Sequence, residues 1–162
     1  AELCSARLAQ RLNGRCINLH APAILSTPEL AAALRQEPLI RDQLHALGDC
    51  NKALFAAGSC TTESHVVLAG IATAADIAEY RARGARAVLC GRFVDAQGAH
   101  VAGALDERMI GITPERMQDL EMGLLVSCGP DKVEPMAAVL RGGYASHLVT
   151  DNVTAQALLA EG

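Results

Sequence analysis

The sequence predicts an α/β fold with a mostly parallel sheet and helices on both faces. Segments with helical spacing of apolar residues alternate with short apolar runs typical of strands along almost the whole chain. Hydrophobic residues make up 51% of the 162 positions, which is enough for a sizeable core. The chain has two Phe, two Tyr and no Trp, and small core side chains allow helices and strands to approach closely. No interior linker divides the sequence, so we expect a single domain over 1–162.

Local signals at helix starts and in turns predict the individual elements. Residues 26–29 match a capping box with Pro28 in the first turn, and Asp131 with Glu134 matches another. Asp151 directly follows an apolar run and is expected to cap the last helix. The segment 95–98 has the composition of a turn. In chain order, we expect helices over 2–13, 26–36, 38–47, 73–83, 113–120, 131–140 and 151–159, and strands over 16–19, 52–57, 87–90, 123–128 and 147–150.

Charge and cysteine usage argue against several classes of function. The net charge is −4 and the basic residues are scattered, which is atypical of a domain that contacts nucleic acid directly. No run approaches the roughly 18 apolar residues of a membrane-spanning helix. The six cysteines include no C-x-x-C pair, so we expect no metal site and reduced thiols in a cytoplasmic protein. Cys90 and Cys128 lie in apolar runs and are expected to be buried.

Two strand-to-helix loops could bind a ligand, because ligands of α/β folds bind at the carboxyl ends of strands. The loop 58–64 follows a buried strand, and its backbone N–H groups and hydroxyls suit a phosphate, although an ordinary polar loop has the same composition. The loop 128–132 carries Lys132 at a helix start. A cation there opposes the helix dipole at a cost of roughly a few tenths of a kcal/mol, whereas a bound anion would reverse that sign. The alternative is a solvated surface lysine.

No catalytic constellation is evident in the sequence. Asp151 is expected to be a helix cap and Asp95 a turn residue, and the five histidines fall in separate elements. Catalytic and nucleotide-binding fingerprints are absent from the sequence. We therefore expect no catalytic residue, no cofactor and no enzymatic activity.

An ordered series of motifs resembles one protein family over nearly the whole chain. Its members carry L-x-A-P-A, C-G-R-F-F-D-x-x-G, R-V-I-G-I, G-G-x-x-K and L-R-G-G-Y followed by L-x-T-D-x-x-T-A. The corresponding segments of this sequence are Leu19–Ala23, Gly91–Gly98, Arg108–Ile112, Cys128–Lys132, Arg141–Tyr144 and Leu148–Ala155. The chain thus resembles the SorC-type sugar-binding domain of bacterial transcriptional regulators, which is often labelled DeoR-like.

The resemblance implies a Rossmann-like fold related to phosphosugar isomerases and deaminases. It implies a domain that binds a sugar phosphate as effector and signals to an N-terminal helix-turn-helix. This sequence contains no such region and starts without Met, so we expect an N-terminally truncated domain. DNA would be bound only by the missing helix-turn-helix. A dimer or tetramer is implied as well.

The matched motifs imply a set of ligand-binding residues. Lys132 is expected to contact the effector's phosphate, and Gly58 and Ser59 to form part of the pocket. Gly129 and Arg92, which lie in matched motifs, complete the expected set.

Three departures from the family pattern bear on what the pocket binds. Val88 stands where the family usually has Asp or Glu, Cys128 replaces the first glycine of G-G-x-x-K, and 56–58 read Ala-Ala-Gly in place of G-I-G. The family's carboxylate accepts hydrogen bonds from sugar hydroxyls, so its replacement affects the recognition of a polyol, and we expect either an altered ligand or a lost ligand response. Two alternatives remain: a phosphosugar isomerase or deaminase with Asp95 or His147 as base, and an oligomerisation module with a decayed pocket.

Overall fold

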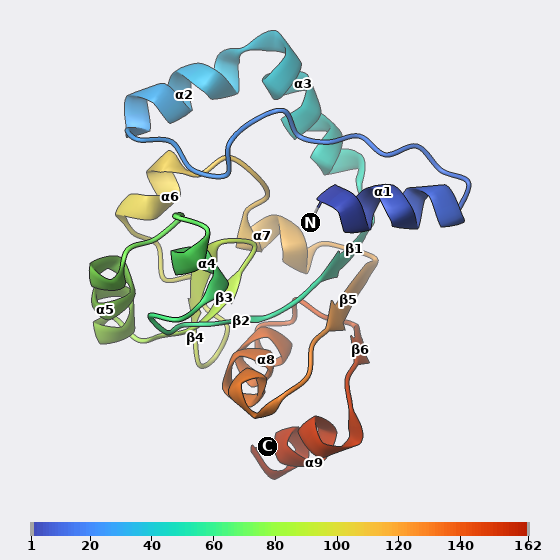
Figure 1. Ribbon diagram of the computed structural model, residues 1–162, viewed down its shortest axis with the longest axis vertical. Coiled ribbons are helices and arrows are strands. Elements are labelled where there is room, and N and C mark those ends of the chain that lie inside the picture. Colours follow the sequence, from blue (N-terminus) through green and yellow to red (C-terminus); the bar gives the residue numbers. More distant parts are fainter. Residues whose placement is uncertain (1, 162) are drawn as a thin grey trace.

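The computed structural model describes residues 2–161, and the strands of this part of the chain form two three-stranded sheets (Figure 1). The strands are β1 (Lys52–Phe55), β2 (Gly58–Ser59), β3 (Ala85–Leu89), β4 (Arg92–Asp95), β5 (Met122–Val126) and β6 (His147–Val149). The first sheet has the order β1-β5-β6 and is parallel, with Leu124 opposite both Leu54 and His147. The second has the order β2-β3-β4 and is antiparallel. Ala56 and Ala57 join β1 directly to β2, so one stretch of chain passes through both sheets (Figure 1).

The helices of the described chain flank these sheets. They are α1 (Glu2–Arg11), α2 (Pro28–Gln36), α3 (Pro38–Ala46), α4 (His65–Leu68), α5 (Ala74–Ala82), α6 (Ala104–Arg108), α7 (Pro114–Gln118), α8 (Val133–Arg141) and α9 (Asn152–Glu161), with short 3-10 turns η1 (Leu47–Asp49) and η2 (Pro130–Lys132). Among them, no helix is long and apolar enough to cross a membrane.

The predicted α/β class with a parallel sheet is confirmed, and the second sheet adds an antiparallel part that the sequence pattern did not indicate. The tight turn between β3 and β4 accounts for one of its two antiparallel pairs. Cys90 and Gly91 have φ angles of 51° and 82°. Two successive residues with positive φ form the type of turn whose twist suits a two-residue β-hairpin. The chain therefore reverses at once instead of crossing over through a helix.

Side-chain caps fix several of the predicted helix starts. Thr73 accepts a hydrogen bond from the Asp76 amide while the Asp76 carboxylate accepts one from the Thr73 amide, which completes a capping box for α5. Thr27, rather than Ser26, caps α2 by accepting from the Leu30 amide. Asp151 accepts from the Thr154 amide at 2.8 Å, so its predicted role as the cap of α9 is confirmed.

Three local expectations were wrong. Residues 16–19 form no strand: they are held from α3 instead, where the Gln43 side chain donates to the Asn18 carbonyl oxygen. The helix expected from residue 131 begins at Val133 after a 3-10 turn, and the Asp131–Glu134 capping box is absent because the Asp131 carboxylate accepts a bond from Lys132. Cys90 and Cys128 are exposed, and Cys60 is the buried cysteine.

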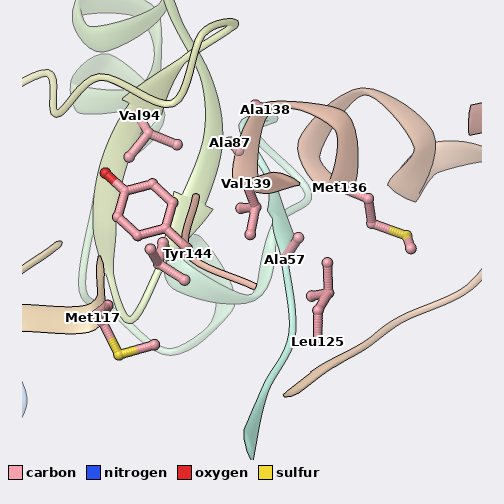
Figure 2. Packing of buried hydrophobic residues seen from close by; sticks show 10 residues of the cluster. Ala57, Ala87, Val94, Met117, Leu125, Met136, Ala138, Val139 and Tyr144 are labelled. Carbon is pink, nitrogen blue, oxygen red and sulfur yellow. The ribbon is translucent and has the colours of Figure 1, made fainter. Parts of the chain in front are cut away.

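Two apolar clusters lie on opposite faces of the antiparallel sheet. Ala87 and Leu89 of β3 pack with Met136 and Val139 of α8 and with Tyr144 (Figure 2). Ala85, Val88 and Phe93 pack on the other face with Ile77 and Tyr80 of α5. The Phe93 and Tyr80 rings stack with centroids 4.1 Å apart. Because α8 is buried along residues 135–139, it holds the η2 turn at its start in a fixed position.

Candidate functional site

A cavity of about 940 Å³ lies where β1, β3 and β5 end at their carboxyl termini. Its lining comes from the residues just after each strand and from η2 with the start of α8, which agrees with the general position of ligand sites in α/β folds. The lining includes Ala56, Ala57, Gly58, Ser59, Cys60, residues 61–65, Val88, Cys90, Gly91, Ser127, Pro130, Asp131, Lys132, Glu134 and Pro135.

The two loops singled out in the sequence meet in this cavity through Lys132 and Ser59. The Lys132 ammonium donates to Ser59 Oγ at 2.9 Å and lies 2.7 Å from Asp131 Oδ2. Ser59 Oγ donates to the Asp131 carbonyl oxygen at 3.0 Å. The Ser59 backbone is fixed in turn by pairing with Ala87 in the second sheet. An ammonium has three donors, so with two partners it retains one N–H for a ligand.

The charge in this corner is balanced by a neighbouring carboxylate. The hydrogen bond from Lys132 lowers the pKa of Asp131, so the carboxylate is ionised at neutral pH and is the counterion of the lysine when no ligand is bound. An incoming phosphate would compete with Asp131 for the same ammonium. Lys132 lines the cavity with 29% of its side chain exposed, so its ammonium is accessible to a ligand.

Gly129 shapes the second loop instead of facing the cavity with its amide. Its φ of 113° is a conformation that other residues rarely adopt. The Gly129 N–H donates to Thr154 Oγ1 at 2.9 Å, and the Thr154 hydroxyl donates to Asp151 at 3.0 Å. The start of α9 thus anchors the loop that carries Lys132.

Val88 gives the cavity an apolar wall. It lies opposite Gly58 in the antiparallel register and is buried. A Cβ placed on Gly58 would lie 3.1 Å from the Val88 Cβ, so the glycine leaves room for the valine. The carboxylates in the lining are those of Glu63, Asp131 and Glu134. The Glu134 carboxylate lies 3.5 Å from the Arg86 guanidinium and is more than half exposed.

Arg92 lies apart from the other predicted ligand-binding residues. It lines a second cavity of about 600 Å³ on the other side of the β3–β4 turn, and its side chain is 7% exposed. Its Nη1 lies 2.7 Å from Asp106 Oδ1, and its Nε donates to the Ile112 carbonyl oxygen. His100 bridges Asp106 at 2.8 Å and Glu115 at 3.2 Å.

This ion-pair cluster, which is buried at Arg92 and Asp106 and exposed at Glu115, was not predicted from the sequence. Burial on its own would raise the pKa of Asp106, but hydrogen bonds from Arg92, the Gly103 amide and His100 together lower it. Asp106 and Glu115 lie 14 and 23 positions from Arg92 on separate helices, and neither stands in a local pattern that singles it out.

The residues considered as catalytic bases lie outside the larger cavity. Asp95 accepts hydrogen bonds from the Gln97 and Ala99 amides and is the turn residue expected from the sequence. His147 is exposed on β6 beside Ser146. Among residues 2–161, no group of three or more His, Cys, Asp or Glu side chains is arranged to hold a metal ion.

Comparisons with known proteins place this chain in a family. A family model described as "Putative sugar-binding domain" matches residues 1–160. The uncharacterized transcriptional regulator YjhU of Escherichia coli K12 is 35% identical over 156 residues, which cover 96% of this chain and 48% of YjhU. The transcriptional regulator LsrR of Enterobacter sp. strain 638 is 28% identical over 143 residues, 86% of this chain and 44% of LsrR.

A solved structure agrees on the fold. The sorbitol operon regulator SorC from Klebsiella pneumoniae superposes with a TM-score of 0.89 at 22% identity, covering 98% of this chain and 51% of SorC. The chain spans about half the length of the curated relatives it matches. With its family match over nearly all residues and its α/β fold, the chain belongs to the sugar-binding domain family of SorC- and DeoR-type transcriptional regulators.

Proposed function

We propose that this domain binds a phosphorylated sugar as the effector of a transcriptional regulator, with the phosphate held by Lys132. The observation that carries the proposal is the contact between Lys132 and Ser59 inside a cavity at the carboxyl ends of the strands. Lysine is a common phosphate ligand, and the Ser59 hydroxyl can donate to a phosphate oxygen at the same point once it releases the Asp131 carbonyl oxygen. Gly58 and the loop closed by Gly129 give the cavity its shape. Arg92 supports the hairpin between the two cavities through its pair with Asp106.

The apolar wall at Val88 affects which sugar fits. Where a carboxylate would accept hydroxyl protons, this cavity offers a valine, and Glu134 and Glu63 supply acceptors from other sides. We expect the preferred ligand to present a hydrophobic carbon to Val88 and its hydroxyls to these glutamates. The domain performs no chemistry in this proposal, because Asp95 and His147 lie outside the cavity lining.

The regulatory mechanism requires parts beyond this chain. The relatives of this chain are named transcriptional regulators, and this chain carries a net charge of −4 without a basic stripe. We propose that 1–162 is one effector-binding domain, that a helix-turn-helix in another part of the protein contacts DNA in the cytoplasm, and that the protein acts as a dimer or tetramer. Effector binding would shift the population between a DNA-binding and a released arrangement.

A thermal-shift screen of phosphosugars on the complete regulator tests this proposal. A ligand at 100 times its Kd stabilises the folded state by about 2.7 kcal/mol, which is readily measured. Lys132→Ala should abolish the shift. Lys52→Ala is the matched control, because Lys52 is an exposed lysine on β1 that pairs with Glu121 and does not line the cavity. The proposal fails if no phosphosugar stabilises the protein or if both lysine variants respond alike. Turnover of a phosphosugar would favour the isomerase alternative, and oligomerisation without any ligand response would favour the module with a decayed pocket.

A further inference from the structure

The second cavity carries an excess of positive charge. Its volume is about 600 Å³. It is open on one side and is lined by α2, the end of α3 with η1, the segment 109–113 and α7, together with Arg92 and Asp106. The charged groups in its lining are three arginines, Arg35, Arg92 and Arg116, and one carboxylate, Asp106, with His45 at the end of α3. Three guanidiniums against one carboxylate are unexpected in a chain whose net charge is −4.

The carboxylate in this lining is already engaged. Asp106 Oδ1 lies 2.7 Å from Arg92 and 2.8 Å from His100, and its other oxygen accepts from the Gly103 amide. Asp106 therefore offers little compensation for the charge of Arg35 or Arg116.

The other two arginines bind backbone carbonyl groups and leave most of their donors available. Arg35 Nη2 donates to the carbonyl oxygens of Met109 at 2.7 Å and Glu107 at 3.0 Å. Arg116 Nη2 donates to the Gly48 carbonyl oxygen at 2.9 Å. Within residues 2–161, neither guanidinium forms a salt bridge. A guanidinium carries five N–H donors, and its planar geometry matches carboxylate and phosphate. The backbone contacts hold both side chains in place without neutralising them.

The remaining walls are apolar. Leu44 and Leu47 contribute one side and Met109 and Ile112 another. A volume in the range of small-molecule sites, apolar walls and a few fixed polar groups are the general features of a ligand pocket. We propose that this cavity is a second ligand site, which binds a small organic anion bearing carboxylate or phosphate groups through Arg35 and Arg116. Its position is distinct from the Lys132 cavity, because none of the described residues lines both.

Isothermal titration of the complete chain with citrate, inorganic phosphate and glucose at fixed ionic strength tests the proposal. Citrate and phosphate are expected to bind, and uncharged glucose is not. Arg116→Gln should weaken binding of these anions at least about tenfold, since it removes a charge-assisted contact. Arg35→Lys, which keeps the charge but loses the planar fork, should weaken citrate more than phosphate.

Two further variants distinguish binding in this cavity from a general effect of charge and from binding at Lys132. Arg41→Gln makes the same charge change on α3 outside the cavity and should leave the affinity unchanged. Lys132→Ala should also leave citrate affinity unchanged while it abolishes the response to phosphosugars, so the two proposals fail independently. The inference is overturned if citrate does not bind, if Lys132→Ala removes citrate binding, or if Arg41→Gln weakens binding as much as Arg116→Gln. Circular dichroism of each variant checks that the fold is retained.

Discussion

Replacing Asp106 by asparagine should lower the free energy of unfolding by about 3–5 kcal/mol, which is the usual cost of removing one partner of a buried ion pair. The Arg92 side chain is 7% exposed and that of Asp106 is 16% exposed, so water screens the pair weakly. Asp106 accepts hydrogen bonds from Arg92, His100 and the Gly103 amide, and from the Tyr80 hydroxyl at 3.4 Å. An asparagine keeps one acceptor oxygen for these four donors, and its NH₂ group faces donors that it cannot satisfy.

Urea denaturation followed by circular dichroism measures this loss. For a chain of this size, the expected change corresponds to a fall of about 6–20 °C in Tm. Asp42→Asn is the matched control, because Asp42 pairs with Arg41 at 3.0 Å with both side chains about half exposed or more. That exposed pair should contribute less than about 1 kcal/mol. If Asp106→Asn costs no more than Asp42→Asn, the cluster does not stabilise the fold and our reasoning about its burial is wrong.

The stabilising contribution of Asp106 should depend on pH in a defined direction. Because hydrogen bonds lower the pKa of Asp106 in the folded state, the carboxylate stabilises the fold at every pH above its unfolded pKa of about 3.9. That contribution is lost as the pH falls through the lower folded pKa. The difference between the wild type and Asp106→Asn should therefore be largest near pH 7 and should shrink below about pH 3.9. A difference that is the same at pH 7 and pH 3 would contradict the assignment to a charged carboxylate.

Three other substitutions have defined outcomes. Gly91→Ala should destabilise the fold by about 1 kcal/mol or more, because its φ is 82° and the new Cβ would overlap Met109 Cε. Denaturation of the double variant with Met109→Ala should show that the loss of stability is partly restored. Thr73→Ala should cost about 1 kcal/mol by removing the capping box of α5, whereas Thr62→Ala in an exposed loop should cost almost nothing in the same thermal unfolding measurement. Ser59→Ala should weaken phosphosugar binding by roughly tenfold in calorimetry, because it removes one hydroxyl contact to the ligand while Lys132 remains.

Local chemistry was sufficient to predict elements whose ends are fixed by their own residues. Thr73 and Asp76 stabilise the start of α5 regardless of what packs on the helix, and the same holds for Asp151 and Thr154 at α9. Residues 16–19 have the composition of a strand but lie beside α3, where Gln43 binds their backbone. Such outcomes depend on which segments become neighbours, and no local pattern contains that information.

The candidate site was predictable where it depends only on the direction of the strands, because parallel neighbours place their carboxyl ends side by side. Ser59 and Lys132 are 73 positions apart, and each stood in a loop that followed a predicted strand. Parallel strands bring their carboxyl ends to one edge, so the two loops meet. The cationic cavity has no equivalent signal. Arg35 and Arg116 belong to different helices, and only the packing of α2 and α7 around the segment 109–113 brings them together.

The β3–β4 turn shows why membership in one motif does not imply membership in one site. Gly91 and Arg92 are adjacent in the sequence, yet Gly91 lines the larger cavity and Arg92 lines the smaller one. The positive φ angles at Cys90 and Gly91 reverse the chain between β3 and β4. Met109 fills the space directly beside Gly91. Met109 itself lines the smaller cavity, so it connects Gly91 to that cavity. Substitutions at these adjacent positions should therefore have different effects. Gly91 variants should affect both cavities through Met109, whereas Arg92 variants should act first on the Asp106 cluster.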